Sequence, residues 1–585
     1  MVFLLDFFLY NSNITQNGGI IMSFQDYQYI RPNIKNFGED FKKRLQNFYD
    51  ASTVFEQELA MNEINDLRNE FSTMENICAI RHSIDTNDKF YEDEQAFFDE
   101  NTPIVQSYGQ QYYKALISSP FREQLEEKYG QQLFALAECE VKILSEEVIP
   151  DLQEENKLTT EYGKLVAAAK LPFYGEVKTL AQISAHFEDK DREVRKVAYD
   201  TYFGYFSENQ DKFDLIFDKL VKIRSSIANK LGFSNFVELA YARMLRTDYN
   251  ANDVKKFRDQ VYDTIVPIAT ELRERQAKRI GVDQLYYYDD KFEFVTGNAT
   301  PKGSPEWIIE NGKKMYDELS KETSEFFQFM LDEDLLDLVA KEGKQGGGYC
   351  TYIPNYKAPY IFSNFNGTSG DIDVLTHEAG HAFQVYESRK FNTPEYYWPT
   401  YEACEIHSMS MEFFTWPWQE NFFKEDTEKY YFTHLSSAVT FISYGVAVDE
   451  FQHAIYEKPE LTPEERHGLW KELEAKYLPH RVNDGNSYLE KGGLWQRQGH
   501  IYQSPFYYID YTLAQICALQ FWNKMHEDRD AAWSDYVGLC QLGGSKSFLG
   551  LVSEAKLESP FKEGSIENTL TPVKKWLDGV NDHNL

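Results

Sequence analysis

The sequence predicts a mainly α-helical protein with one small β-sheet directly before a helix. Residues 122–163 are rich in Glu, Lys, Gln, Leu and Ala, which are strong helix formers. Apolar residues in this stretch recur every three or four positions, as on one face of a helix: Leu133, Ala137, Val141, Leu144 and Val148. Residues 343–369 instead begin with glycines and continue with two short runs of β-forming residues.

The length of the chain favours more than one domain. It has 585 residues, of which 42% are hydrophobic, and this exceeds what one hydrophobic core usually holds. Further amphipathic stretches occupy residues 40–70, 190–230, 251–279 and 305–340. A charged run around residue 190 suggests a boundary between an N-terminal helical domain, 22–190, and a second domain, 191–585.

The first 21 residues have a different character from the rest of the chain. Their apolar start is short, Asp6 interrupts it, and no Lys or Arg precedes it, so it makes a poor signal peptide. The codons of Gly18 and Gly19 can read as a bacterial ribosome-binding sequence before Met22. We therefore expect translation to start at Met22 and residues 1–21 to be a translated leader. A native product that begins at Met1 would contradict this.

Charge and cysteine content narrow the classes of partner. With 60 Lys and Arg against 94 Asp and Glu, the formal net charge is −34, which repels nucleic acids and anionic lipids. No apolar run approaches the ~18 residues that span a bilayer. The six cysteines are scattered without a CxxC pair, which favours a reducing compartment. We expect a cytoplasmic protein that binds neither nucleic acid nor membrane.

Between residues 343 and 371 the sequence predicts two strands and the start of a helix. Strands are expected at 349–353 and 360–362, and Pro359 suits an edge strand. Thr368, Ser369 or Asp371 can cap the helix that follows. A functional site is expected where this sheet meets the helix.

That helix carries the motif His377-Glu378-Ala379-Gly380-His381. Histidines four residues apart lie on one helical face, so both imidazoles can reach one metal ion. Glu378 points to the neighbouring face, where it can take a proton from water whose pKa a zinc ion lowers to about 7. The alternative is a chance match, which the scarcity of histidine, 12 in 585 residues, makes uncommon.

Asp373 lies one turn before the first histidine of the motif. Its carboxylate can accept the second ring N–H of a ligand histidine, which orients the ring. It can equally be an acidic residue favoured by the helix dipole near the N-terminus. Both interpretations stay open.

A third metal ligand has to come from elsewhere in the chain. The long signature HExxHxxGxxH is excluded, because Gln384 and Glu387 stand where it needs glycine and histidine. A helical stretch at 401–412 places three acidic residues on one face, at spacings of three and seven: Glu402, Glu405 and Glu412. Spacing alone does not choose among them.

Residues 377–383 and 405–412 together resemble the thimet oligopeptidase family, and more narrowly its bacterial oligoendopeptidase F branch, which includes the Pz-peptidases. Residues 358–361 and 364–368 also fit. The resemblance implies one Zn²⁺ per chain, with Glu405 as the ligand that joins His377 and His381. Glu402 and Glu412 then become supporting or structural residues. A His₂Glu ligand set suits zinc, although cobalt or manganese stays open.

Residues 500–511 resemble the substrate-binding His and Tyr segment of the same family. Thimet-type relatives carry three tyrosines there; the matching positions here are Ser504, Tyr508 and Tyr511, so the first is missing. The resemblance implies that His500, Tyr508 and Tyr511 bind substrate and stabilise the oxyanion. Each such donor is worth ~3 kcal/mol of barrier. Tyr507 is an alternative to Tyr508, and packing is the alternative role in a chain with 40 tyrosines.

The resemblance implies a multi-helical zincin-type metallopeptidase with a small sheet beside the active-site helix. A deep channel between two domains would admit short unfolded peptides, with residues 191–585 as the catalytic domain. The strand at 358–362 would pair with the substrate backbone by strand addition. The expected function is zinc-dependent cleavage of internal bonds in short oligopeptides. The alternatives are a zinc carboxypeptidase and a non-enzymatic peptide binder, and the presence of Glu378 argues against the binder.

Overall fold

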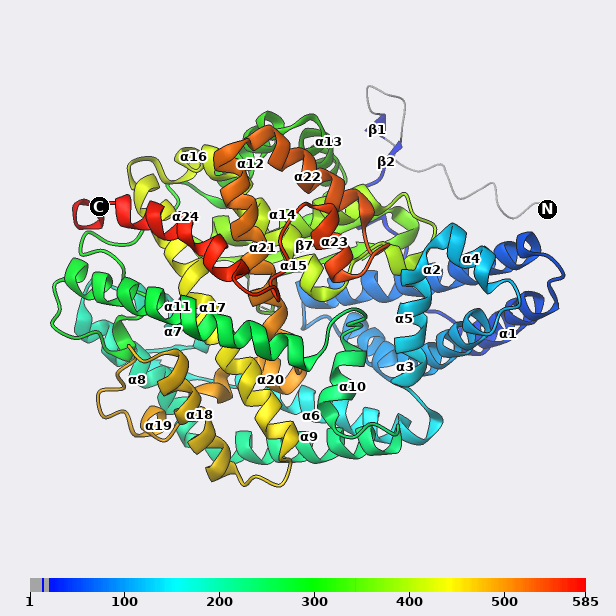
Figure 1. The fold of residues 1–585 in the computed structure, drawn as a ribbon, viewed down its shortest axis with the longest axis horizontal. Coiled ribbons are helices and arrows are strands. Elements are labelled where there is room, and N and C mark those ends of the chain that lie inside the picture. The colour runs from blue at the N-terminus through cyan, green and yellow to red at the C-terminus, as the bar shows by residue number, and fades with distance from the viewer. Residues whose placement is uncertain (1–12, 15–19, 342) are drawn as a thin grey trace. The chain divides into compact units, whose positions relative to one another are not determined.

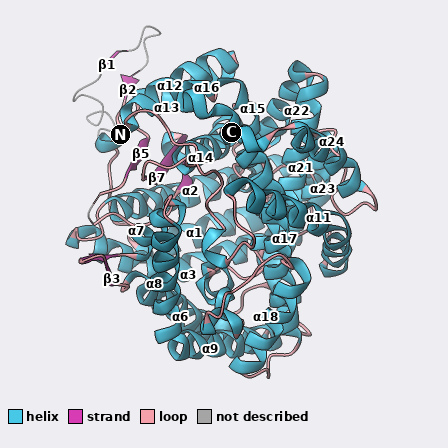
Figure 2. Cartoon of the chain, turned by 90° about the vertical axis from the view of Figure 1, so that its left-hand side faces the viewer, coloured by secondary structure: helices cyan, strands magenta, loops and turns pink. Residues whose placement is uncertain are grey.

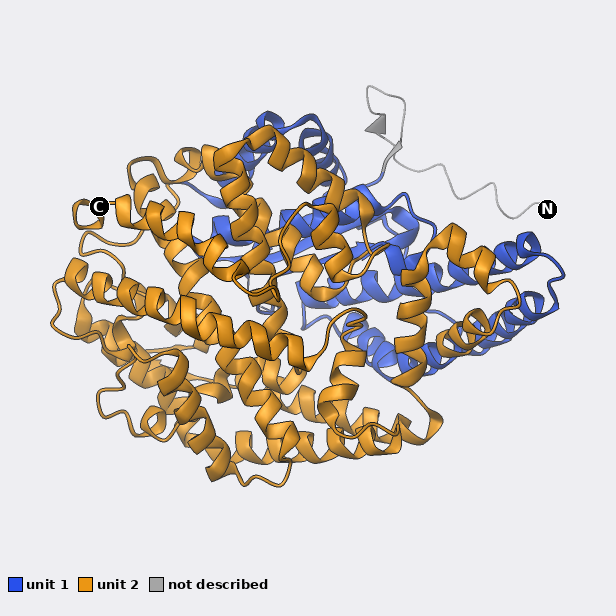
Figure 3. Cartoon of the chain, in the orientation of Figure 1, with its two compact units in different colours: residues 1–108, 303–397 blue, residues 109–302, 398–585 orange. Residues whose placement is uncertain are grey.

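The computed structural model describes residues 13–14, 20–341 and 343–585. They form two compact units, each built from two separate stretches of chain: Met1–Tyr108 with Gly303–Tyr397, and Gly109–Lys302 with Trp398–Leu585 (Figure 3). The predicted boundary at residue 190 divides the chain at one point along its sequence, whereas each of these units combines two separate stretches. The boundary stays a prediction. The expected leader, 1–21, lies outside the described residues apart from the strand pair β1 (Asn13–Ile14) and β2 (Ile20–Ile21).

Helices dominate both units, which confirms the predicted fold class (Figures 1 and 2). Up to residue 302 they are α1 (Ile34–Asp50), α2 (Val54–Ile84), α3 (Lys89–Ile117), α4 (Arg122–Tyr129), α5 (Gln131–Lys142), α6 (Ile149–Ala167), α7 (Leu180–Ser184), α8 (Arg192–Glu208), α9 (Gln210–Lys230), α10 (Phe236–Arg243) and α11 (Ala251–Ile280). A hairpin of β3 (Leu171–Phe173) and β4 (Glu176–Lys178) lies between α6 and α7.

The part of the chain after residue 302 is also mostly helical. Its helices are α12 (Pro305–Leu319), α13 (Lys321–Asp332), α14 (Gly370–Ser388), α15 (Tyr401–Phe414), α16 (Glu420–Phe423), α17 (Thr427–Glu457), α18 (Pro463–Tyr477), α19 (Ser487–Glu490), α20 (Gly499–Gln503), α21 (Tyr508–Glu527), α22 (Arg529–Leu542), α23 (Phe548–Glu554) and α24 (Ser565–Gly579). None of the helices in the described part of the chain combines the length and apolar character needed to cross a bilayer.

The predicted helical stretch 122–163 is divided into α4, α5 and α6. The apolar spacing therefore follows one helix only as far as Lys142, where α5 ends. Pro150 lies in the first turn of α6, where a proline lacks no needed hydrogen bond, so the chain breaks before the proline rather than at it.

Three strands form the small sheet, in the order β5-β7-β6: β5 (Leu336–Val339), β6 (Tyr349–Ile353) and β7 (Ala358–Phe365). The prediction that the strand around 358–362 is an edge strand is wrong, because β7 is central. Pro359 is tolerated there because β7 is paired on one side only at this position. Pro359 pairs with Tyr352 of β6, and the pairing with β5 begins at Ile361. The strand β5 was not expected, since its residues continue a helical stretch.

In the first unit, the sheet lies against α14, which contacts both β6 and β7. Ile361 and Phe362 of β7 and Leu375 of α14 are fully buried. Farther along α14, the ring of Phe383 lies 5.5 Å from that of Phe326 in α13, measured between centroids. Helix α14 thus packs against both the sheet and α13.

In the second unit, α15, α17 and α21 pack together in the core. Helix α21 is buried on nearly every side, with Leu513, Ile516 and Phe521 fully enclosed, as expected for a helix in the middle of a large unit. Residues on α15 and on the segment leading into α21 are therefore held by tight packing.

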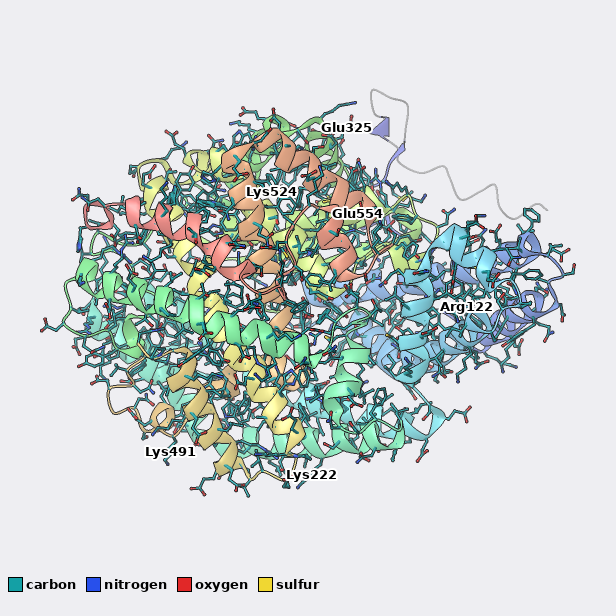
Figure 4. The ribbon with its side chains drawn as sticks, in the orientation of Figure 1. Arg122, Lys222, Glu325, Lys491, Lys524 and Glu554 are labelled. Carbon is teal, nitrogen blue, oxygen red and sulfur yellow. The ribbon has the colours of Figure 1, made fainter. Side chains whose placement is uncertain are left out.

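Charged side chains lie along the outer faces of the helices, where Figure 4 draws them as sticks. Lys222 of α9, for example, is exposed and pairs with Asp218 one turn earlier at 2.6 Å. Exposed pairs of this kind stabilise a helix by less than about 1 kcal/mol each, so the buried contacts above carry more of the stability.

Candidate metal centre and its neighbours

The start of helix α14 is fixed by the carboxylate of Asp371. It accepts hydrogen bonds from the backbone N–H groups of Asn366 and Gly367, each at 2.8 Å. Ser369 occupies the N-cap position, but its side chain makes no capping hydrogen bond. Gly367 has φ +88°, a left-handed conformation that glycine adopts without strain. Of the three predicted caps, Asp371 is thus the residue that ties the helix to the loop after β7.

His377, Glu378 and His381 lie together in the middle of α14. The two imidazole rings are 5.1 Å apart between centroids, as their spacing of one turn predicts. Glu378 is buried. A Cβ atom added to Gly348, just before β6, would lie 3.7 Å from Oε1 of Glu378 and 3.3 Å from the carbonyl oxygen of Phe362. The glycine therefore leaves room beside the carboxylate. The predicted role of Asp373 stays a prediction.

Glu405 lies in α15 and is buried, with hydroxyl groups on both of its oxygens. Ser408 Oγ, one turn later, donates to Oε2 at 2.9 Å. The hydroxyl of Tyr507 donates to Oε1 at 2.5 Å. Glu412, by contrast, bonds to Nε2 of His434 at 2.7 Å. Glu405 and Glu412 therefore have different surroundings.

His377, His381 and Glu405 each offer one ligand atom, and these atoms lie within 4.8 Å of one another. Among the described residues, this is the group whose geometry could hold a metal ion; Glu402 and Glu412 are not in it. Two imidazole nitrogens and one carboxylate oxygen match the ligands of catalytic zinc sites, which leave further positions open. The chemistry of the donor set thus fits the predicted zinc.

His500 lies in the short helix α20 and is held by Gln498. Gln498 Nε2 is 2.7 Å from Nδ1 of His500, and Gln498 Oε1 accepts from the hydroxyl of Tyr444 at 2.9 Å. With the amide N–H donating to Nδ1, the proton of a neutral imidazole is on Nε2. Burial lowers the pKa of His500, against the opposing effect of the Glu405 charge. A neutral ring with an N–H donor on Nε2 is the result.

Three tyrosine rings surround His500, at centroid distances of 5.7 Å for Tyr507, 5.1 Å for Tyr508 and 5.7 Å for Tyr511. Tyr508 is the first residue of α21, so Tyr508 and Tyr511 share a helical face as predicted. Burial raises the pKa of Tyr508 and of Tyr507, so both keep their protons. Ser504, in place of the missing tyrosine, donates only its backbone N–H, to the carbonyl of His500 at 2.9 Å.

A buried charge cluster lies next to this segment, and its basic member, Arg246, was not among the residues predicted to belong to the site. Arg246 Nη2 donates to Asp510 Oδ1 at 2.7 Å and to the carbonyl oxygen of Phe506 at 2.6 Å. Burial raises the pKa of Glu402 to about 8, helped by the Asp510 charge. Burial also raises the pKa of Asp510 to about 7, against the attraction of Arg246. Glu402, one turn before Glu405 on α15, thus belongs to this cluster. No spacing rule links Arg246 to residues so far along the chain.

Comparison with known proteins identifies the family. Residues 24–144 match the Peptidase M3 N-terminal domain, and residues 185–569 match Peptidase family M3. The second match covers more than half of the chain and includes every candidate residue described above.

Individual relatives agree with the family match. An oligoendopeptidase F homolog of Borreliella burgdorferi is 26% identical over 461 residues, which are 75% of each chain. An oligoendopeptidase F homolog of Lactococcus lactis subsp. lactis is 22% identical, over 68% of this chain and 67% of its own. A solved structure of Pz peptidase A with an inhibitor is 61% identical, with a TM-score of 0.94 over 96% of this chain and 100% of its own. The chain therefore belongs to peptidase family M3, and it is a metallo-endopeptidase of the oligoendopeptidase F type.

Proposed function

We propose that this protein is a zinc-dependent endopeptidase that cuts internal bonds of short unfolded oligopeptides, with one zinc ion held by His377, His381 and Glu405. The observation that carries the proposal is the group of three ligand atoms within 4.8 Å, with Glu378 on the same helix as the two histidines. A mere peptide binder has no need of a base at that position. The acid–base residue and the ligands together support hydrolysis.

The proposed mechanism assigns the proton transfers to Glu378. Zinc, when bound, supplies Lewis-acid polarisation of the scissile carbonyl and a lowered pKa for the attacking water. Glu378 takes the proton of that water and passes it to the leaving amine, which is general base and then general acid catalysis.

His500, Tyr508 and Tyr511 are proposed to bind the substrate and to stabilise the oxyanion. Neutral His500 offers its Nε2–H, and the tyrosines offer hydroxyls. Donors that are already oriented cost little reorganisation when charge develops on the carbonyl oxygen, and each lowers the barrier by ~3 kcal/mol.

The proposed substrates are short peptides in an extended conformation, admitted by a channel between domains that excludes folded proteins. Since β7 is the central strand, an added peptide strand would pair with the edge strand β6 instead. Backbone pairing reads the shape of the chain more than its side chains, which suits an enzyme for varied peptides. A cytoplasmic location completes the proposal.

One assay tests the function. A peptide of about eight residues, blocked at both ends, is incubated with the protein, with and without a chelator, beside the variant Glu378→Gln. We expect internal cleavage that the chelator abolishes, and a fall in kcat of about 10²–10⁴-fold in the variant. Cleavage that survives the chelator, or full activity in Glu378→Gln, would refute the mechanism. A zinc carboxypeptidase would leave the blocked peptide intact and trim only its free-ended counterpart.

A further inference from the structure

The carboxylate of Glu405 carries one hydroxyl hydrogen bond on each oxygen. Ser408 is a local partner, one helical turn away on α15. Tyr507 is a distant one, 102 residues later in the chain, and its bond of 2.5 Å is the shorter of the two. An ionised carboxylate has about four lone-pair sites, so two hydroxyl hydrogen bonds do not by themselves use all of its capacity as an acceptor or ligand.

We propose that Tyr507 is a positioning residue for the metal ligand Glu405, with Ser408 as its local partner, rather than a donor to the oxyanion. This rests on the proposed zinc site. Outer hydrogen-bond partners of metal ligands fix the orientation of the ligand and raise its affinity for the metal. Charge-assisted O–H bonds to carboxylates are short and strong, as the bond from Tyr507 is.

The direction of this hydrogen bond excludes a second task for the same proton. A carboxylate only accepts, so the Tyr507 hydroxyl donates to Glu405 and has no other proton to give. The ring of Tyr511 lies beside that of Tyr507, 4.8 Å away between centroids.

Tyr507 and Tyr508 therefore differ in what their hydroxyls can do. The Tyr507 hydroxyl is committed to Glu405. Within the described part of the chain, the Tyr508 hydroxyl makes no hydrogen bond to another residue, so it is the one whose proton is immediately available to a substrate. This division of roles separates the metal ligand from the substrate-binding hydroxyls.

The backbone before Tyr507 is built to hold the tyrosine in place. Phe506 has φ +68°, a left-handed conformation that a bulky residue adopts only under constraint. Its N–H donates to Gln452 Oε1 at 2.9 Å, and its carbonyl accepts from Arg246 Nη2 at 2.6 Å. The phenyl ring itself is fully buried. Three independent contacts thus fix the residue from which Tyr507 reaches Glu405.

The test measures zinc affinity rather than peptide cleavage. Tyr507→Phe removes one hydroxyl and keeps the ring. We expect its zinc dissociation constant, measured by competition with a chromophoric chelator, to rise about 10–100-fold. The matched control is Tyr536→Phe, since the Tyr536 hydroxyl donates to the carbonyl of His407 on the same helix at 2.8 Å but not to Glu405. The control should bind zinc within about twofold of the unaltered protein.

A second measurement reports the ligand geometry directly. In the Co²⁺-substituted protein, the visible absorption bands should shift in Tyr507→Phe and stay in place in Tyr536→Phe. If Tyr507→Phe does not fold, as judged by thermal unfolding without metal, Ser408→Ala is compared with Ser410→Ala. Ser410 is also buried on α15, but it lies away from the Glu405 hydrogen bonds. Loss of zinc affinity is then expected in Ser408→Ala only.

The outcomes separate this inference from the proposed function. Unaltered protein that binds zinc tightly, together with unchanged affinity and spectrum in Tyr507→Phe, would overturn the positioning role and leave the zinc site standing. Zinc binding that is equally tight in His377→Ala and in the unaltered protein would instead overturn the zinc site itself.

Discussion

Gln498 holds His500 by a 2.7 Å contact between its amide nitrogen and Nδ1 of the imidazole. The Tyr444 hydroxyl donates to the other end of the same amide, which fixes the amide orientation as well. The Nε2–H of His500 therefore points away from Gln498 and is available to a substrate. Gln498 thus orients the imidazole without using its Nε2–H.

Replacing Gln498 by leucine tests this arrangement. A hydrogen bond between neutral groups is worth about 1 kcal/mol, so we expect kcat to fall about fivefold. KM should change little if His500 acts on the oxyanion rather than on the bound substrate. Steady-state kinetics on the blocked peptide measures both constants. An unchanged kcat in a stably folded Gln498→Leu would show that the tautomer of His500 does not matter.

Gly348 is predicted to be essential for space beside Glu378. An added Cβ already lies 3.3 Å from the carbonyl oxygen of Phe362 and 3.7 Å from Glu378 Oε1, so the branches of a valine would displace the carboxylate or the strand. We expect Gly348→Val to lower kcat/KM at least tenfold, by analogy with other misplaced catalytic groups. Zinc affinity should stay unchanged.

The control for Gly348 is Gly346→Ala. A Cβ at Gly346 meets no heavy atom within 4 Å, so this variant changes the same glycine-rich segment without a clash. Equal losses of kcat/KM in the two variants would mean that the whole segment needs glycine flexibility, and that the space beside Glu378 is unimportant.

The buried pair of Arg246 and Asp510 is predicted to matter more for stability than for cleavage chemistry. Both side chains are fully buried, and removing one partner leaves an uncompensated charge. We expect Arg246→Met to lower the free energy of unfolding by about 3–5 kcal/mol. The loss should be larger at pH 8 than at pH 5.5, because Asp510 takes up a proton at the lower pH.

Urea unfolding at the two pH values measures this loss. Arg246→Met combined with Asp510→Asn removes both charges and should recover part of the stability. If the double variant is no more stable than Arg246→Met at pH 8, the buried charge of Asp510 is not the cause of the loss.

Because of Glu402, the free energy of unfolding should fall as the pH rises. Its pKa is raised to about 8, so the folded state holds a proton that the unfolded chain releases near pH 4.5. The contribution of this proton to the free energy of unfolding is complete below the pKa of the unfolded chain. It decreases as the pH rises and is lost once the pH passes about 8.

The variant Glu402→Gln removes this titration. We expect its thermal midpoint to exceed that of the unaltered protein at pH 8.5 and to approach it at pH 5.5. Glu208→Gln, at an exposed position near the end of α8, is the control and should leave the difference between the two pH values unchanged. If the thermal midpoints of Glu402→Gln and of the unaltered protein change with pH in the same way, the carboxyl group at this position does not have a raised pKa.

Local sequence rules predicted the parts of the site that lie within one helix. The spacing of His377 and His381, and the position of Glu378 between them, follow from helical geometry alone, and α14 has that geometry. Spacing on α15 offered three glutamates, and only the family resemblance singled out Glu405. The choice depends on where α15 packs, which no single-helix rule contains.

The edge-strand prediction failed for the same physical reason. Pro359 suggested an edge strand, but whether β7 is an edge depends on its pairing with β5, where Leu336 pairs with Ile361 far along the sequence. Helical periodicity describes α21 from its first residue, Tyr508, onwards, so it contains no information on the hydrogen bond from Tyr507 to Glu405. The left-handed backbone of Phe506 redirects the residue before the helix, and the sequence Pro505-Phe506-Tyr507 carries no glycine to announce it.

The constrained backbone at Phe506 has a consequence for how the proposed zinc ion would exchange. Ordering a flexible ligand costs conformational entropy at the moment of binding, and this cost weakens affinity. In this protein, the contacts of Phe506 with Arg246 and Gln452, together with its buried ring, hold the strained backbone once the chain has folded. Tyr507 and Glu405 are therefore in place before a metal ion would bind. A carboxylate preformed in this way would let the proposed zinc ion leave and return while the protein remains folded.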